Sequence, residues 1–350
     1  MNAKKKITIY DLAEITGFSV GTVNRALNGK NRIKEETRQL ILETAAKVGY
    51  KANPAAQGLH RNPMRIGVIL YCPVFEYVND INRGICAAAQ DLEKYNVEVD
   101  IRQIPYTTNR ECRQKAMELM RYFQHEKYNG IALFQSSTKA DVAEISRIID
   151  EISDSGIPVA TIANDIPESK RIFHVGVNAF TAGRMAAEIL WLSCPGKDVA
   201  LLTNSMESEV NRQCIEGFYD FAGNSRFSGI RLYEHFDEPN LVIQQTERMI
   251  NDNPELSGIY MTSASATSAC QHIRKLGKRE YKIITTDLLE ETPQILYDGT
   301  ASATIFQDPY RQGKNAVKNL YDYIVSKQAE DTYSIIPSII LSSNVSFYKN

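Results

Sequence analysis

The feature that most constrains the fold of this chain is an alternation of short apolar runs with longer amphipathic stretches from about residue 64 onward. The ten strand-like runs are residues 65–71, 97–105, 130–135, 158–164, 172–178, 198–204, 230–236, 258–263, 281–287 and 302–307. Helical stretches separate most of them, at residues 80–94, 111–126, 141–154, 179–193, 208–223 and 240–252. Such alternation predicts parallel sheets with helices on both faces. Because ten strands exceed one ordinary domain, we expect two similar α/β lobes.

Length and composition exclude several classes of protein. The 350 residues are too many for one compact core, and 43% apolar with 23% charged residues is typical of a globular protein. No apolar run approaches the roughly 18 residues of a membrane span. Asp11 and Glu14 interrupt the segment after the basic start, so we expect no secretory signal. The six cysteines are scattered without a CxxC pair, which favours free thiols in a reducing cytoplasm and no metal site.

The net charge of −2 conceals an asymmetry between the two ends of the chain. Residues 1–62 contain eleven Lys and Arg against five Asp and Glu, whereas residues 63–350 contain 29 against 37. A basic segment followed by an acidic body indicates that the first segment meets a polyanion.

The first fifty residues have the pattern of three helices. Thr8 and Asp11 form a capping box that opens a helix to about Thr16, and Gly17 supplies a turn. Ser19 can cap the second helix, which is expected to end near Asn28 and Gly29. The third helix is expected to begin near Lys34 and to turn four apolar residues inward: Leu40, Ile41, Ala45 and Val48. Helix, glycine turn and second helix together predict a helix-turn-helix.

The second of these helices has one apolar and one polar face. Its apolar positions are Val20, Val23, Ala26 and Leu27. The positions left available are Gly21, Asn24, Arg25 and Asn28. Arginine reads guanine through O6 and N7, and asparagine reads adenine or contacts phosphate, so this face fits DNA. The break at residues 51–63 offers room for a second contact element.

The segment ITIYDLAEITGFSVGTVNRALNGKNRIKEETRQLILETAAKVGYKANPAAQGL closely resembles the DNA-binding head of the LacI/GalR family of bacterial repressors. The matching features are T-x-x-D-[LV]-A, G-x-S-x-x-T-V-x-R-x-[LV]-N and GY-x-x-N-x-x-A-x-x-L. The resemblance implies that Val20, Gly21 and Arg25 face bases in the major groove. It also implies a short hinge helix at about residues 53–59 whose Leu59 wedges into the minor groove.

Two residues depart from the family pattern in this hinge. Ala52 stands where relatives often have proline, and Gly58 costs a helix about 1 kcal/mol relative to alanine. We expect the whole DNA-binding surface to comprise Thr8, Ser19, Val20, Gly21, Thr22, Asn24, Arg25, Asn28, Tyr50, Asn53, Ala56 and Leu59. Since Gly21 has no side chain, base reading is expected to fall mainly to Arg25.

The body resembles the type I periplasmic sugar-binding fold that this family carries as its sensor. The fold expected is therefore α/β: a three-helix helix-turn-helix domain and a two-lobed, doubly wound parallel-sheet sensor. The expected boundaries are residues 1–52 for the head, 53–63 for the hinge, 64–172 with 303–333 for the first lobe, and 173–302 with 334–350 for the second.

Ligands of such sheets bind at the carboxyl ends of the strands, between the lobes. Polar residues at strand ends, and residues that resemble family contacts, are therefore candidates, together with two aromatic residues that could stack on a sugar ring. The candidate effector-binding residues are Phe75, Tyr77, Asn164, Asp165, Arg212, Ser263, Asp287 and Gln307.

We therefore expect a homodimeric regulator that binds a pseudo-palindromic operator and a small effector, a sugar or related metabolite, with no cofactor and no membrane partner. An enzyme is disfavoured because the chain has no P-loop, no Gly-rich nucleotide motif and no HExxH spacing among its five histidines. Two alternatives stay open: a cytoplasmic sugar-binding module whose head does not bind DNA, and a regulator whose effector is a purine or another corepressor.

Overall fold

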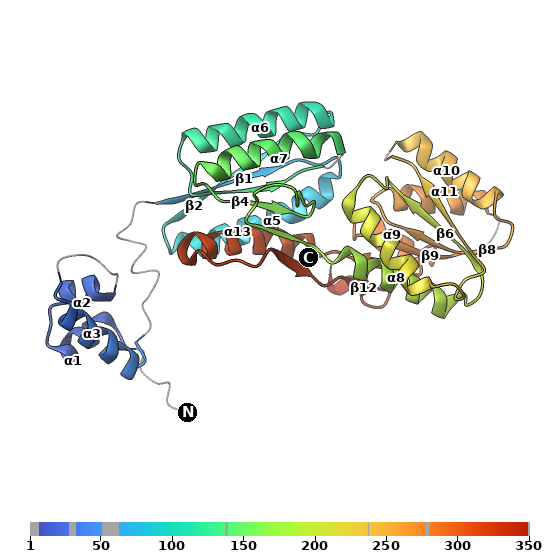
Figure 1. Ribbon diagram of the computed structural model, residues 1–350. Coiled ribbons are helices and arrows are strands. Elements are labelled where there is room, and N and C mark those ends of the chain that lie inside the picture. The colour runs from blue at the N-terminus through green and yellow to red at the C-terminus, as the bar shows by residue number, and fades with distance from the viewer. Residues whose placement is uncertain are drawn as a thin grey trace. The chain divides into compact units, whose positions relative to one another are not determined.

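The structure is a computed structural model that describes residues 7–27, 33–50, 63–136, 139–236, 238–277 and 280–348. The chain forms two compact units. The first contains the three N-terminal helices, and the second contains nearly all the described residues from Met64 onward (Figure 1). None of the helices in the described ranges is long and apolar enough to cross a membrane.

The first unit is the expected helix-turn-helix, with α1 (Ile9–Thr16), α2 (Val20–Leu27) and α3 (Glu35–Lys47). The predicted capping box is present, because the Thr8 side chain accepts from the Asp11 N–H and the Asp11 carboxylate accepts from the Thr8 N–H. Gly17 ends α1 at a φ of 73°, a left-handed conformation that glycine adopts without strain.

A small apolar core holds these three helices together. Its buried members are Leu12, Ala13, Val23, Ala26, Ile41 and Ala45. The expectation for α3 is wrong at one position: Leu40 is 51% exposed, whereas Ile41 and Ala45 are buried and Val48 is half-buried. The inward face of α3 follows the i, i+4 spacing of Ile41 and Ala45, which turns the neighbouring position 40 outward.

The second unit begins with a six-stranded sheet in the order β11-β5-β4-β3-β1-β2. Its strands are β1 (Met64–Leu70), β2 (Val97–Gln103), β3 (Gly130–Phe134), β4 (Val159–Ile162), β5 (Phe173–Val177) and β11 (Thr332–Ile335). All neighbouring strands are parallel. The central strands β1, β3 and β4 are buried almost throughout, as expected for a parallel sheet covered on both faces.

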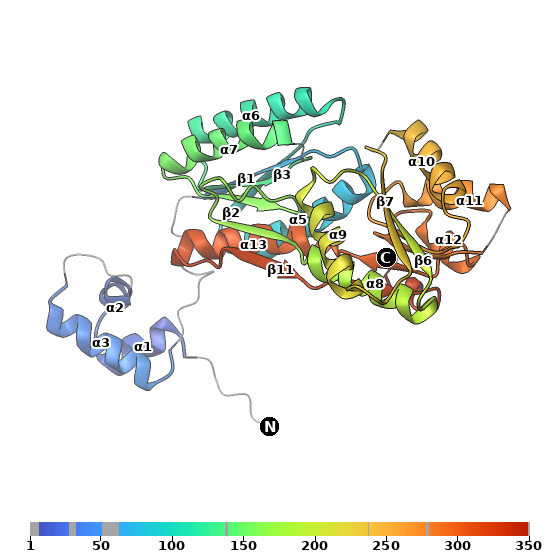
Figure 2. The same ribbon diagram turned by 45° about the vertical axis from the view of Figure 1, so that its right-hand side comes forward.

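Helices lie along the first sheet (Figure 2). They are α5 (Phe75–Glu93), α6 (Asn109–His125), α7 (Lys139–Asp154) and α13 (Pro309–Ser326). Residues of α6 and α7 form one core with β1, β3 and β4. Helices α5 and α13 approach each other closely, since a Cβ on Gly84 would overlap the Tyr310 carbonyl and one on Gly313 the Ile81 carbonyl.

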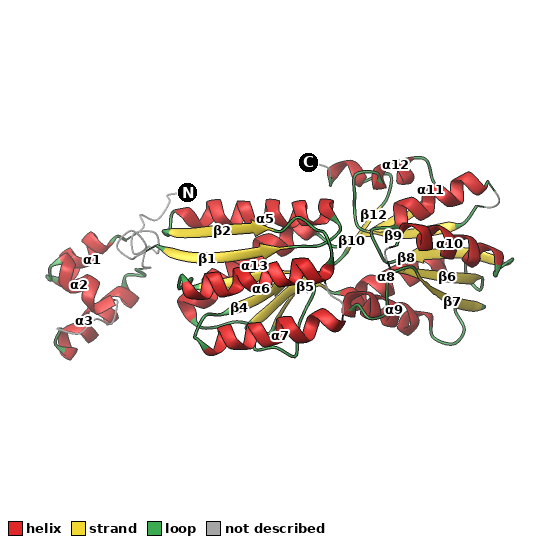
Figure 3. Ribbon diagram, turned by 90° about the horizontal axis from the view of Figure 1, so that it is seen from above, coloured by secondary structure: helices red, strands yellow, loops and turns green. Residues whose placement is uncertain are grey.

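A second six-stranded sheet follows in the order β12-β10-β9-β8-β6-β7. Its strands are β6 (Asp198–Thr203), β7 (Gly229–Glu234), β8 (Leu256–Met261), β9 (Lys282–Thr286), β10 (Ala303–Phe306) and β12 (Ser338–Ile340). All neighbours are parallel except β12, which runs antiparallel to β10. Each sheet thus has the doubly wound order that the strand–helix alternation predicts (Figure 3).

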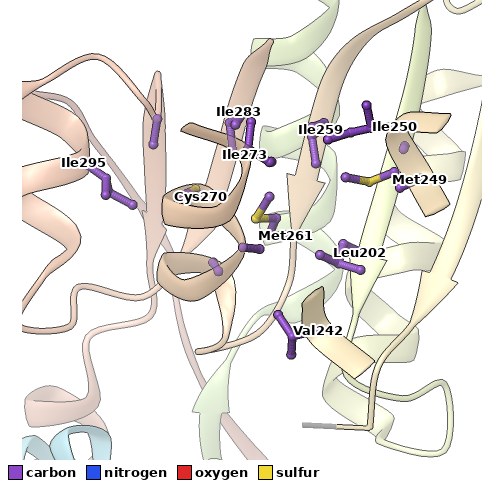
Figure 4. Packing of buried hydrophobic residues seen from close by; sticks show 14 of the residues in the cluster. Leu202, Val242, Met249, Ile250, Ile259, Met261, Cys270, Ile273, Ile283 and Ile295 are labelled. Carbon is purple, nitrogen blue, oxygen red and sulfur yellow. The ribbon is translucent and has the colours of Figure 1, made fainter. Parts of the chain in front are cut away.

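Helices also cover both faces of the second sheet. They are α8 (Ala179–Ser193), α9 (Glu209–Ala222), α10 (Pro239–Asn251), α11 (Ala266–Leu276) and α12 (Thr292–Tyr297), and a 3-10 turn (Val345–Phe347) follows β12. One core joins α10, α11 and α12 to the sheet, with Val242, Met249 and Ile273 among its buried members (Figure 4). A second core joins α8 and α9 to the opposite face.

The strand pairings put the boundaries between the two lobes at residues other than those expected. β5 pairs with β4 and so belongs to the first sheet, although the second lobe was expected to begin at residue 173. β10 pairs with β9 and belongs to the second sheet, although residue 303 was expected to open the return to the first lobe. The chain therefore crosses between the sheets after Val177, after Phe306 and after Ile335.

Candidate functional site

The first candidate site is the exposed face of α2 in the head. Val23 and Ala26 are buried in the three-helix core, which leaves Ser19, Gly21, Asn24 and Arg25 exposed. This face therefore agrees with the expected distribution of apolar and polar positions. Val20 is half-buried and packs against the core, so only part of its side chain is accessible.

Local hydrogen bonds hold several of the expected DNA contacts in place. The Arg25 Nε–H donates to the Gly21 carbonyl at 3.2 Å, which leaves the terminal guanidinium nitrogens for other partners. The Thr22 N–H donates to the Ser19 hydroxyl at 3.2 Å, so Ser19 caps α2 as predicted. Tyr50 is half-buried against the core, and burial raises the pKa of its hydroxyl.

The remaining expected contacts lie outside the described residues. They are Asn28, Asn53, Ala56 and Leu59. The expected hinge helix at about residues 53–59 lies entirely outside the described ranges. Their role in DNA binding stays a prediction.

The second candidate site is a cavity of about 140 Å³ in the second unit. It takes its lining from both sheets and from α5 and α9, and we call it the interlobe cavity. Its lining residues are Cys72, Pro73, Val74, Tyr77, Phe134, Ser136, Ala163, Asn164, Asn204, Ser208, Val210, Asn211, Thr262, Ser263, Ala264, Asp287 and Gln307. Most of the polar members directly follow the strands, so the cavity lies at the carboxyl ends where parallel sheets bind ligands.

Asp287 follows β9 and is the buried carboxyl group of this cavity. Its side chain is 7% exposed, and its Oδ1 has no hydrogen-bond partner among the described residues. Burial raises the pKa of this carboxyl to about 7, against the lowering effect of a hydrogen bond from Gln307. A buried carboxylate oxygen without a partner is costly, and a ligand that donates a hydrogen bond would remove that cost.

A glutamine connects the cavity to the first lobe. The Gln312 Nε2 group donates to the Gln307 carbonyl at 2.8 Å and to the Tyr77 hydroxyl at 3.0 Å. Tyr77 packs against Phe134 with ring centroids 5.9 Å apart, so two aromatic rings contribute to the wall. Gln307 lies on the segment where the chain crosses from β10 to α13. A ligand that contacts both Gln307 and Tyr77 would therefore touch a lobe crossing and α5.

Buried polar pairs fix the opposite side of the cavity. The Thr262 hydroxyl donates to the Asn211 Oδ1 at 3.3 Å and shares a hydrogen bond of 2.7 Å with the Thr203 hydroxyl. The Ser263 hydroxyl lies 3.0 Å from the Nε2 of buried His235. These bonds orient hydroxyl and amide groups that can bind a polar ligand.

The structure brings five of the eight expected effector-binding residues to this cavity: Tyr77, Asn164, Ser263, Asp287 and Gln307. Asn164 also donates to the Gln135 carbonyl at 2.7 Å.

The other three lie elsewhere in the second unit. Phe75 begins α5 and is 66% exposed. Asp165 binds the guanidinium of Arg171, with its Oδ2 at 2.8 Å from Nη2. Arg212 projects from α9 toward solvent and pairs with Glu209 and Glu216.

Sequence reasoning missed several polar lining residues. Asn204, Ser136 and Thr262 each follow a strand, so the rule that selected Asn164 and Asp287 also applies to them. Asn211 has a helical signal: it precedes Cys214, Ile215 and Phe218 at i+3, i+4 and i+7, which places it on the buried face of α9. That same spacing turns its neighbour Arg212 away from the cavity.

No group of three or more His, Cys, Asp or Glu residues in the described ranges is arranged to hold a metal ion. All six cysteines are free thiols. The cavity is lined by hydroxyls, amides, two aromatic rings, one carboxyl group, one thiol and several aliphatic side chains.

Comparison with known proteins agrees with this division of the chain. Residues 8–53 match the family of bacterial regulatory proteins of the lacI type, and residues 66–328 match a periplasmic binding protein domain. The HTH-type transcriptional regulator pepR1 of Lactobacillus delbrueckii subsp. lactis is 24% identical over 95% of this chain and 96% of its own length. Catabolite control protein A of Priestia megaterium is 26% identical over 59% of this chain and 57% of its own.

Among solved structures, GanP, a glucose-galactose binding protein from Geobacillus stearothermophilus, is similar in fold to the second unit. The TM-score is 0.72 at 24% identity, covering 81% of this chain and 99% of that one. The second unit therefore has the periplasmic-binding-protein fold. The chain belongs to the lacI family of bacterial transcriptional regulators and carries a periplasmic-binding-protein-type domain after its helix-turn-helix.

Proposed function

We propose that this protein is a ligand-responsive regulator that binds a specific operator as a homodimer and a small polar effector, a sugar or related metabolite, in the interlobe cavity. The observation that carries the proposal is the presence in one chain of a DNA-binding head and a cavity lined at the strand ends by hydroxyls and amides. Such groups match the paired hydroxyls of a sugar, and Tyr77 and Phe134 provide aromatic surface for its apolar ring face.

The head supports sequence-specific recognition. Arg25 lies exposed on α2, where its Nε–H bonds the Gly21 carbonyl, and the neighbouring Asn24 is exposed as well. A dimer would place two such helices on half-sites about one helical turn apart, which makes a two-fold symmetric operator the expected target. Because transcription is controlled where the chromosome is, we propose that the protein acts in the cytoplasm.

The cavity offers a physical route from effector to DNA. A ligand that bonds Asp287 and Gln307 would contact the crossing between β10 and α13, and would draw on residues of both lobes. Closing the lobes around the ligand would change the geometry at which the two heads of a dimer leave the body. By linkage, the operator and the effector then alter each other's affinity by the same factor.

DNA binding is tested by fluorescence anisotropy with the full-length protein. The probes are fragments from upstream of its own and neighbouring genes, each paired with a scrambled fragment of equal composition. We expect at least one fragment to bind more tightly than its scrambled partner, with an affinity that falls as salt rises. Equal binding to every sequence would contradict the proposal and favour a sugar-binding module whose head does not read DNA.

Arg25→Ala provides the matching variant, with Arg248→Ala as control because Arg248 is exposed on α10 and forms an ion pair with the exposed Asp252. Losing one bidentate base contact costs about 1–3 kcal/mol, so specific affinity should fall by roughly 5- to 150-fold in Arg25→Ala and stay unchanged in Arg248→Ala. Sedimentation of the protein with and without the bound DNA fragment tests whether it is a dimer in solution and on the operator. Sugars and nucleobases tested side by side by thermal shift distinguish the proposed effector from a purine.

A further inference from the structure

The interlobe cavity has an uneven charge. Asp287 is the one charged side chain among the described residues that line it, and no Lys, Arg or His is among them. The lining otherwise consists of neutral polar and apolar groups. A ligand with a negative charge would therefore meet a buried carboxylate without any cation to offset it.

The groups packed around Asp287 do not supply the missing charge. From α5 it faces Asp80, a second carboxylate, which raises the pKa of Asp287 further, and the neutral phenol of Tyr77. From β8 and α9 it faces the buried phenol of Tyr260 and the buried thiol of Cys214. Arg83 is engaged with Asp80 at 2.8 Å. The surroundings of Asp287 are thus neutral or negative.

Two nearby basic side chains are committed elsewhere. Arg212 lies one residue from the lining Asn211, but it points toward Glu209 and Glu216 on its own helix. His235 lies behind the lining, with its Nε2 against the Ser263 hydroxyl. Neither places a cation at the Asp287 carboxylate, whose Oδ1 has no partner within the described part of the chain.

We infer that the interlobe cavity selects a small polyhydroxylated ligand that carries an ammonium group, in its simplest form an amino sugar, and that Asp287 sets this preference. The inference rests on the proposed function and specifies the chemical class of its effector. An ammonium group supplies both the hydrogen-bond donor that Oδ1 lacks and the opposite charge that the surroundings lack, and charge-assisted hydrogen bonds are about twice as strong as neutral ones. The aromatic rings of Tyr77 and Phe134 favour a cation further. The hydroxyls of the ligand would bind the side-chain amides of Asn164, Asn211 and Gln307.

The test uses matched sugars and calorimetry on the full-length protein. For each of glucose, galactose and mannose, the 2-amino sugar, the parent hexose and the hexose 6-phosphate are titrated at about pH 7, where the ammonium form of the sugar and the ionised form of Asp287 are both populated. We expect one amino sugar to bind about tenfold more tightly than its parent hexose, and its 6-phosphate counterpart to bind more weakly than both. The inference is overturned if no amino sugar binds, or if a neutral or phosphorylated sugar binds best.

Asp287→Asn tests the assignment to this residue, with Asp252→Asn as a control of equal charge change on the exposed end of α10. In Asp287→Asn the amino sugar and the hexose should bind about equally tightly, with an affinity ratio of about one. Asp252→Asn should keep the preference for the amino sugar. An unchanged preference in Asp287→Asn overturns the assignment. If that variant does not fold, the sugar series on the unaltered protein still decides the ligand class.

The two proposals fail separately. A hexose or sugar phosphate that binds best, with specific DNA binding intact, overturns the amino-sugar inference and leaves the regulator in place. Loss of sequence preference in the DNA titration overturns the proposed regulator function whatever the sugar series shows.

Discussion

Asp287 has an unusual backbone conformation in addition to its buried carboxyl group. Its φ is 72°, in the left-handed region that non-glycine residues rarely occupy and that Asn and Asp tolerate best. The main chain is held there by bonds on both sides: its N–H donates to the Ile305 carbonyl at 2.9 Å, and its carbonyl accepts from the Thr304 hydroxyl at 2.6 Å. β10 thus fixes the turn that points a carboxylate into the cavity.

The pKa of Asp287 predicts a pH dependence of stability. Burial raises it from 3.8 to about 7, so the folded state binds the proton more tightly than the unfolded state. The stability that this group contributes is therefore complete below about pH 4 and is lost as the pH rises through about 7, by up to about 4 kcal/mol. Asp287→Asn keeps the φ and removes the charge. We expect its free energy of unfolding in urea to exceed that of the unaltered protein at pH 8 and not at pH 4.

Asp252→Asn is the control, since that carboxylate is exposed and should change stability little at either pH. An Asp287→Asn protein whose stability follows the unaltered protein from pH 4 to 8 would show that Asp287 does not titrate in this range.

Most candidates that follow the end of a strand line the cavity, whereas Arg212, which lies on helix α9, does not. Asn164, Ser263 and Asp287 follow buried strands and line the cavity as expected. Arg212 was chosen by resemblance, but the apolar spacing of α9 turns its neighbour Asn211 inward instead. The burial of Asp287 and the lack of a hydrogen-bond partner for its Oδ1 result from how distant segments pack around it. A single sequence does not specify that packing.

Two helix pairs in the second unit pack through glycine. A Cβ on Gly183 of α8 would overlap the Cys214 carbonyl of α9, and a Cβ on Gly217 of α9 would overlap the Phe180 carbonyl of α8. Gly84 and Gly313 form the same reciprocal arrangement between α5 and α13. Both pairs include a helix that contributes residues to the interlobe cavity, since Tyr77 lies on α5 and Asn211 on α9.

The sign of the change in unfolding free energy caused by Gly183→Ala therefore tests this account of how α8 packs on α9. Helix propensity alone favours alanine by about 1 kcal/mol, but the new methyl group meets backbone that can move only by separating α8 from α9. We expect a net loss of about 1–3 kcal/mol in the unfolding of the second unit, measured by urea denaturation. The comparison variant is Gly21→Ala on exposed α2, where the nearest atom is the Ser19 hydroxyl at 3.9 Å and propensity should dominate. Equal or greater stability of Gly183→Ala would contradict this account of the packing.

Periodicity predicted most of the fold because most strands and helices show the apolar spacing typical of their own type within one segment of the sequence. The ten expected strands all occur, and the expected helix at 179–193 has the bounds of α8. The strands β11 and β12 were not expected, because each is at most four residues long and acquires strand character from pairing with distant β5 and β10. The assignment of β5 and β10 to a lobe also depends on such pairing, which explains the shifted boundaries.

The protein combines a helix-turn-helix head with a two-lobed body. The contacts near the segments where the chain crosses between the lobes determine how a ligand in the cavity could affect the rest of the chain. Glu76 on α5 accepts the Glu290 N–H at 2.5 Å, so the segment before α12 in the second lobe touches a helix of the first. Gln312 on α13 bonds both the crossing residue Gln307 and Tyr77 on α5. The cavity is thus connected to the first lobe through two helices as well as through the chain itself.

Gln312→Met tests whether this connection carries the coupling between effector and operator. The side chain keeps its length and its burial, but it can no longer donate to the Gln307 carbonyl or the Tyr77 hydroxyl. We expect the effector and the operator each to bind alone, while the factor by which one changes the affinity of the other falls from the usual range of about 5–150 toward about one. The measurement is a pair of titrations, operator with and without effector and effector with and without operator, which must give the same factor. Gln114→Met, on the exposed side of α6, is the control and should keep the full factor. If Gln312→Met keeps it as well, the coupling runs through the main-chain crossings alone.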